Sequence, residues 1–134
     1  MSWQTPKTDW REQDAYLAAD DGRIRGNAAY LRDWANRVCA PMDDGPLGQY
    51  SETDVLTVSA YNAVENAVAA VCEEVGPADY APRALTAGGP VWVAADLRRL
   101  EGACAQANRR LLSAELCRPS LHFTLGGEGF DAKL

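Results

Sequence analysis

Three stretches of the chain space their apolar residues alternately three and four apart, which is typical of amphipathic helices. The first spans residues 18–39 and has apolar positions at Ile24, Asn27 or Ala28, Leu31, Trp34 or Ala35, and Val38. The second spans 57–76, with Tyr61, Val64, Val68, Val71 and Val75. The third spans 94–117, with Leu97, Leu100, Cys104, Ala107, Leu111 and Ala114. Leu112 and Leu116 widen this last face beyond a two-stranded contact, so the pattern predicts a mainly α, three-helix bundle.

Residues at the ends of these stretches support the same boundaries. Thr57 is the expected N-cap of the second helix, because its hydroxyl can accept a hydrogen bond from the first turn. Gly76-Pro77 should end that helix, and Pro119 should end the third. Gly22 and Gly26 weaken the first helix but would let a neighbour approach it closely.

The remaining segments are irregular or extended. Residues 1–17 read as an extended arm, 42–49 as a turn-rich loop and 77–90 as a Pro, Ala and Gly-rich connector. Val91-Trp92-Val93 is either an extended entry to the third helix or one strand of a small ribbon. In the tail, 118–134, Ser120 to Leu125 alternates like a short strand before Gly126-Gly127. The whole chain of 134 residues is expected to be one domain.

A repeat relates the three helices. Residues 10–31 align without a gap with 50–71, and this alignment matches Trp10 with Tyr50 and Asp14 with Asp54. The branched residues Ile24, Val64 and Leu100 occupy the same place in the three copies, and we call them the anchors. Each copy is therefore an aromatic-led extended lead-in followed by a helix, and no such unit can bury its apolar face alone.

Composition excludes several function classes. The net charge of −6 argues against a nucleic-acid binder, which needs a basic surface. No stretch has the length of a membrane span, and the N-terminus does not resemble a signal peptide, so we expect synthesis in the cytoplasm. Residues 41–80 hold eight acids and no Lys or Arg, which suits either packing against the two Arg-bearing flanks or a solvated acidic face.

Candidate chemistry is sparse. The cysteines Cys39, Cys72, Cys104 and Cys117 have no short spacing, so we expect reduced thiols and no metal site. His122 is the single histidine and lacks a partner motif for general base catalysis. The sequence thus predicts no enzyme and no cofactor.

Large aromatic and arginine residues are the better candidates for contacts with other proteins, because these types dominate interface hot spots. The candidates are Trp3, Trp10, Tyr50, Trp92, Arg98 and Arg109. An alternative for the tryptophans is that they close the ends of the bundle. The simplest interpretation of the arginine pairs 98–99 and 109–110 is that they flank the third helix and pair with the acidic second one.

One set of motifs comprises Thr5-Pro6-Lys7-Thr8-Asp9-Trp10, Asp14, Arg23-Ile24, Asn27, Gly89-Pro90, Leu97, Arg99-Leu100-Glu101 and Leu121 to Gly127. Together these motifs resemble a family of small tail-region structural proteins from phages and prophages of Gram-positive bacteria. The chain departs from the family pattern at Asp21-Gly22, where Tyr-Asn is usual. The resemblance implies a non-enzymatic component of a virion or tail-like particle that binds other phage structural proteins, and copies of itself are a further candidate partner.

A hypothesis from a different class is an acidic cytoplasmic regulator that binds a basic partner through residues 41–80. A small enzyme ranks last, because no residues support it.

Overall fold

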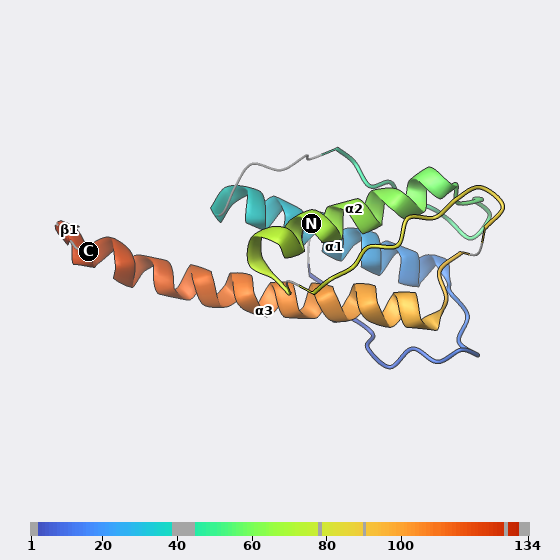
Figure 1. The fold of residues 1–134 in the computed structure, drawn as a ribbon, viewed down its shortest axis with the longest axis horizontal. Helices are drawn as coiled ribbons and strands as arrows, with labels where there is room; N and C mark the ends of the chain where they lie inside the picture. The colour runs from blue at the N-terminus through green and yellow to red at the C-terminus, as the bar shows by residue number, and fades with distance from the viewer. Residues whose placement is uncertain (1–2, 39–44, 78, 90, 128, 132–134) are drawn as a thin grey trace.

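Three parallel helices form the body of the computed structural model. It describes residues 3–38, 45–77, 79–89, 91–127 and 129–131, with side chains described as far as residue 113. The helices are α1 (Ala18–Val38), α2 (Val58–Val75) and α3 (Ala94–Thr124). All three begin at the same end of the bundle (the right of Figure 1), and the segments between them return along its length. The predicted three-helix, mainly α fold is confirmed, and each helix packs on the other two.

The predicted apolar faces form the core. All three anchors are at most 1% exposed, and Leu31, Val68 and Leu111 are equally buried. The expectation for Leu112 was wrong: its side chain is 50% exposed, so it does not widen the buried face of α3. The calls on Ala114 and Leu116 lie outside the residues whose side chains are described.

The caps of α2 match the prediction. Thr57 Oγ1 accepts a hydrogen bond from the Ala60 amide at 3.1 Å. Gly76 closes the other end with φ of +92°, a backbone conformation that favours glycine, and its N–H donates to the Cys72 carbonyl at 2.8 Å.

The predicted start of the C-terminal β-like segment was wrong. Pro119 does not end α3, which continues to Thr124, so Ser120 to Thr124 is helical and only Leu125 of the predicted strand lies in one. Leu121 and Leu125 are also four residues apart, a spacing that a helix satisfies, so the short alternation was ambiguous. The strands are β1 (Leu125–Gly127) and β2 (Gly129–Asp131), which pair antiparallel.

The lead-ins have the repeated local structure that the alignment predicted. The carboxylate of Asp14 accepts from the Arg11 amide at 2.9 Å, and that of Asp54 accepts from the Ser51 amide at 2.7 Å. Each of these turns precedes its helix by the same number of residues. The fold therefore consists of three related lead-in-plus-helix units.

Candidate functional site

A buried charged residue directly follows each anchor: Arg25, Glu65 and Glu101 are only 1–2% exposed. Buried charges are costly unless paired and hydrogen-bonded, so these positions are the first place to look for chemistry. Each residue faces the lead-in of the next unit, so the contacts form a cycle from α1 to α2, α2 to α3 and α3 to α1. We call these three places the junctions.

At the α3–α1 junction, four hydrogen bonds converge on Glu101. Arg23 of α1 donates from Nε to Oε1 and from Nη2 to Oε2, both at 2.8 Å. The first lead-in adds the Lys7 amide at 3.0 Å and Trp10 Nε1 at 2.6 Å. The hydrogen bond to Glu101 raises the pKa of Arg23, although burial opposes this. One carboxylate therefore joins α3, α1 and the N-terminal arm.

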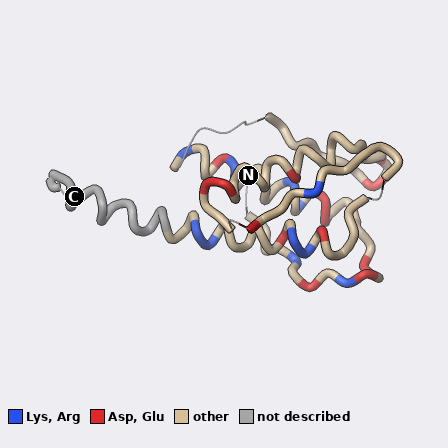
Figure 2. The backbone as a smooth tube through the Cα atoms, in the orientation of Figure 1, with Lys and Arg blue, Asp and Glu red and all other residues tan. Residues whose placement is uncertain are grey.

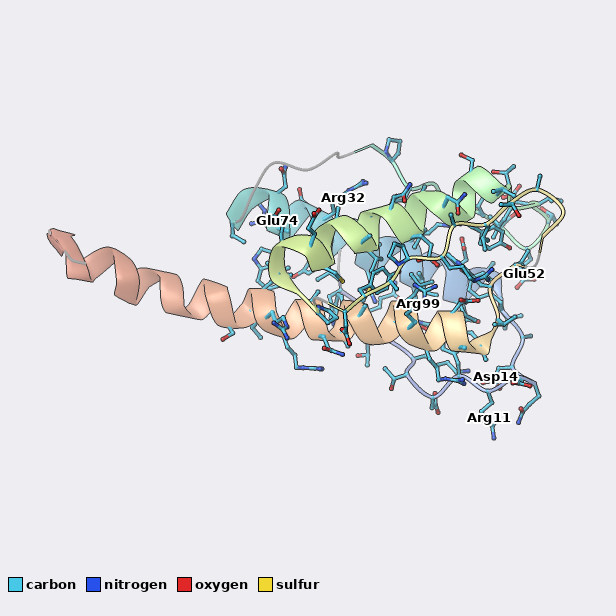
Figure 3. All side chains as sticks on the ribbon, viewed as in Figure 1. Arg11, Asp14, Arg32, Glu52, Glu74 and Arg99 are labelled. Carbon is cyan, nitrogen blue, oxygen red and sulfur yellow. The ribbon has the colours of Figure 1, made fainter. Side chains whose placement is uncertain are left out.

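The α2–α3 junction repeats this arrangement around Glu65. Arg99 donates to both carboxylate oxygens, at 2.9 and 2.7 Å, and lies between α2 and α3 (Figure 3). Trp92 Nε1 donates to Oε2 at 3.1 Å, and Tyr80 donates its hydroxyl proton to Oε1 at 2.7 Å. Burial, and next the hydrogen bond to Glu65, raise the pKa of Tyr80 well above its usual range.

Asp96 extends this junction at the start of α3. It pairs with Arg83 at 2.7 Å and accepts the Val93 amide at 2.9 Å. Burial alone would raise the pKa of Asp96, but the hydrogen bonds from Arg83, Val93 and Arg99 outweigh burial and lower it.

The α1–α2 junction differs in charge. Arg25 occupies the place of the two glutamates, and Ala63 occupies the place of Arg23 and Arg99. The Nε of Arg25 donates to Asp21 at 2.7 Å, and its Nη1 donates to the carbonyls of Leu47 and Ala60 at 3.1 and 2.8 Å. The ring of Tyr50 covers the guanidinium, with 4.7 Å between its centroid and Cζ. Nη2 of Arg25 is buried without a hydrogen-bond partner.

The sequence-predicted interaction residues divide into buried and exposed groups. Trp10 and Trp92 are 1% and 8% exposed and donate to Glu101 and Glu65, so neither side chain is available on the surface for a contact with another protein. Trp3 is half-buried against Tyr30, with 5.9 Å between the ring centroids. Arg98 and Arg109 are exposed, and Arg98 donates to the Trp10 carbonyl. Of the six candidates, only Trp10 and Arg98 lie together; Tyr50 belongs to the Arg25 junction.

The acidic stretch is also divided. Glu65 is buried and pairs with Arg99, whereas Glu52 and Glu74 are exposed at opposite ends of the bundle (Figure 3). Acidic and basic positions are interspersed along the backbone of the bundle (Figure 2). Asp43 and Asp44 lie outside the described residues.

Two thiols are buried in the core. Burial raises the pKa of Cys72 to about 11, and it raises the pKa of Cys104 further. Both are free cysteines, and the calls on Cys39 and the side chains of Cys117 and His122 fall outside the described residues. Across the ranges that the structure describes, no cluster of three His, Cys, Asp or Glu side chains is arranged to hold a metal ion.

Sequence reasoning did not single out Glu65 or Arg25. A detectable signal existed, because a charged residue follows the anchor in each copy of the repeat and falls within the apolar face.

None of the described helices combines the length and apolar character needed to cross a bilayer. In comparisons with known proteins, no family model, curated protein or solved structure matches the chain.

Proposed function

We propose that this protein is a non-enzymatic structural component of a phage or prophage tail-like particle and acts through protein–protein contacts. The particle assignment depends on the motif resemblance. The structure gives those motif residues an architectural role: Lys7, Trp10 and Arg23 all contact Glu101, and Asn27 holds the backbone of Gln4. A shared motif of this kind favours a shared fold.

The observation that carries the contact function is a set of exposed apolar residues where the lead-ins meet the helices. Their exposed fractions are 53% for Leu17, 88% for Val55, 54% for Val91 and 56% for Val93. Leu17 and Val93 are each seven residues before their anchors, and Val55 and Val91 are each nine before theirs. Because the helices are parallel, all four lie toward one end of the bundle (Figure 1). Exposed apolar side chains at the same end of a bundle favour a protein contact at that end.

The regulator hypothesis receives less support. Binding a basic partner through residues 41–80 needs one acidic surface, but Glu65 is internal and the exposed acids Glu52 and Glu74 are at opposite ends.

The test uses the bacterial strain that encodes the chain. After induction, particles are purified on a density gradient and their proteins are quantified by mass spectrometry. We expect the wild-type chain in the particle fraction and the Val55→Asp/Val93→Asp variant in the soluble fraction. Leu112→Asp is the matched control, since Leu112 is equally exposed near the other end of the bundle, and it should still enter particles. Absence of the wild-type chain from every particle fraction would overturn the proposal.

A further inference from the structure

The outer face of α1 carries an uncovered groove of about 1130 Å³. Its floor consists of Ala19, Gly22, Gly26 and Ala29, and a Cβ added at either glycine would meet no atom within 4 Å. One side is bordered by Gln4 of the first lead-in and the other by residues 46–50 of the second. The glycines predicted to let a neighbour approach are therefore open, and no part of the described chain fills the space.

The buried Arg25 lines the same groove and supplies an independent reason to expect a ligand. Its Nη2 has no hydrogen-bond partner, and an unsatisfied buried donor is energetically costly. At the other two junctions, Arg23 and Arg99 donate to both carboxylate oxygens of a glutamate. At the α1–α2 junction, Arg25 occupies the position that is Glu65 or Glu101 in the other two units, so no glutamate is available to accept from Nη2.

The arginines that line the groove leave one buried donor for an acidic ligand. They are at 23, 25, 32 and 37, and the lining also includes one acid, Asp33. Arg23, Arg25 and Arg37 already pair with carboxylates of this chain, and Arg32 donates to the Gly45 carbonyl, so net charge does not select the ligand. The Nη2 of Arg25 is the buried donor without a partner, and a hydrogen bond from a guanidinium to a carboxylate is charge-assisted and stronger than a neutral one.

The shape of the groove suits a peptide. The α1 residues that line it extend from Ala19 to Arg37, about 27 Å along a helix at 1.5 Å per residue. An extended segment of roughly eight residues covers that length. This fold already holds extended backbone against its helices: Asn27 exchanges two hydrogen bonds with Gln4, and Asn62 exchanges two with Leu85.

We propose that the α1 groove binds an extended peptide segment of a partner protein and that a carboxylate of this segment pairs with Arg25. Tyr50 controls access to Arg25. Gly48, with φ of +87°, turns the chain so that the Tyr50 ring lies over the guanidinium, and a Cβ at residue 48 would lie 2.8 Å from that ring. The half-buried ring moves aside when the carboxylate binds. This site goes beyond the proposed function and does not depend on particle assembly.

The test is an NMR titration of the isotope-labelled full chain with a blocked eight-residue peptide of Ala and Ser that carries one central Glu. We expect shifts at the Gly22 and Gly26 amides and at least tenfold weaker binding of the matched Gln peptide. Free glutamate should also bind at least tenfold more weakly. Equal binding of the Gln peptide, equal binding of free glutamate, or no shift at millimolar peptide would overturn the proposal.

A pair of glycines provides variants that preserve the fold. Gly26 and Gly102 both follow their anchors by two residues, and both have open space at Cβ, but only Gly26 lines the groove. Gly26→Leu should abolish the shifts, whereas Gly102→Leu should leave the affinity unchanged. Equal binding by both variants would contradict the location. Self-association that Gly26→Leu removes would assign the groove to a second copy of the chain and overturn the peptide proposal.

Discussion

Arg99 of α3 donates two hydrogen bonds to the carboxylate of Glu65 on α2, from Nη1 to Oε1 at 2.9 Å and from Nη2 to Oε2 at 2.7 Å. The same two-pronged contact joins Arg23 to Glu101 at the next junction. From the lead-ins, the indole N–H groups of Trp92 and Trp10 donate further hydrogen bonds to Glu65 and Glu101, respectively. The buried charges that most resembled a reaction site therefore connect one unit to the next.

A double-mutant cycle measures the energy of this contact. Arg99→Ala leaves Glu65 buried without its counter-charge, and Glu65→Ala leaves several donors without an acceptor, so each should lower the free energy of unfolding by about 3–5 kcal/mol. The double variant should lose less than the sum, with a coupling energy of about 1–3 kcal/mol. Urea unfolding provides the measurement, and Arg109→Ala, on an exposed side chain, is the control. Additive losses would show that the two residues act independently.

The packing of the anchors is tested with a pair of leucines on α3. Leu100→Ala removes a side chain that is fully buried among the three helices and should cost about 2–5 kcal/mol. Leu112→Ala makes the same chemical change at a half-exposed position and should cost no more than about 0.5 kcal/mol. Chemical denaturation of both variants would show the difference, and a loss near zero for Leu100→Ala would contradict the three-helix core.

Alkaline pH should destabilise the folded chain. Burial, and next the hydrogen bond to Asp21, raise the pKa of Tyr16; burial also raises those of Tyr80 and Cys72, the last from 9.0 to about 11. These groups are neutral in both states below about pH 9, so their contribution is fully present there. At higher pH the unfolded chain releases protons that the folded chain retains, and stability falls. The Cys72 contribution is lost between about pH 9 and 11, and the tyrosine contributions begin to fall above pH 10.

Unfolding by urea under reducing conditions, measured from pH 7.5 to 11, tests this expectation. Each buried tyrosine adds a slope of up to about 1.4 kcal/mol per pH unit above pH 10. Tyr16→Phe should reduce that slope, whereas Ser59→Ala, at an exposed position, should not. Stability that stays constant to pH 11 would contradict the assigned environments.

The local pattern was enough to predict the helices but not their junctions. Bounds of α1 and α2 followed from apolar spacing, Thr57 and Gly76, because caps and periodicity are local properties. The parallel direction of the helices could not be predicted, because the long returning segments allow either direction. The arginine pairs of α3 were expected to pair with the acidic second helix, and Arg99 does so. No local rule, however, specifies Glu65, 34 residues away, as the partner of Arg99.

Two local rules failed on α3. Leu112 fits an apolar face by its spacing, but its side chain is 50% exposed, because burial depends on whether a neighbouring helix covers the position. Pro119 is a sequence signal for a helix end, yet α3 extends five residues beyond it. Proline can kink a helix as well as end it, so the signal alone does not decide between the two outcomes.

The central claim is that the buried charges build the domain, and Glu101→Gln tests it most directly. The amide keeps the shape of the side chain but removes its charge and replaces one acceptor oxygen with a donor. Two of the four donors that meet Glu101 therefore lose their acceptor. Hydrogen exchange at the Lys7 amide, measured together with the free energy of unfolding, reports on both the arm and the bundle.

We predict a loss of about 3–5 kcal/mol and loss of protection at Lys7, because two donors are left without an acceptor and Arg23 keeps only Asp20 as a counter-charge. Glu73→Gln, on an exposed side chain of α2, should change neither quantity. A Glu101→Gln variant with wild-type stability and a protected Lys7 amide would contradict the claim.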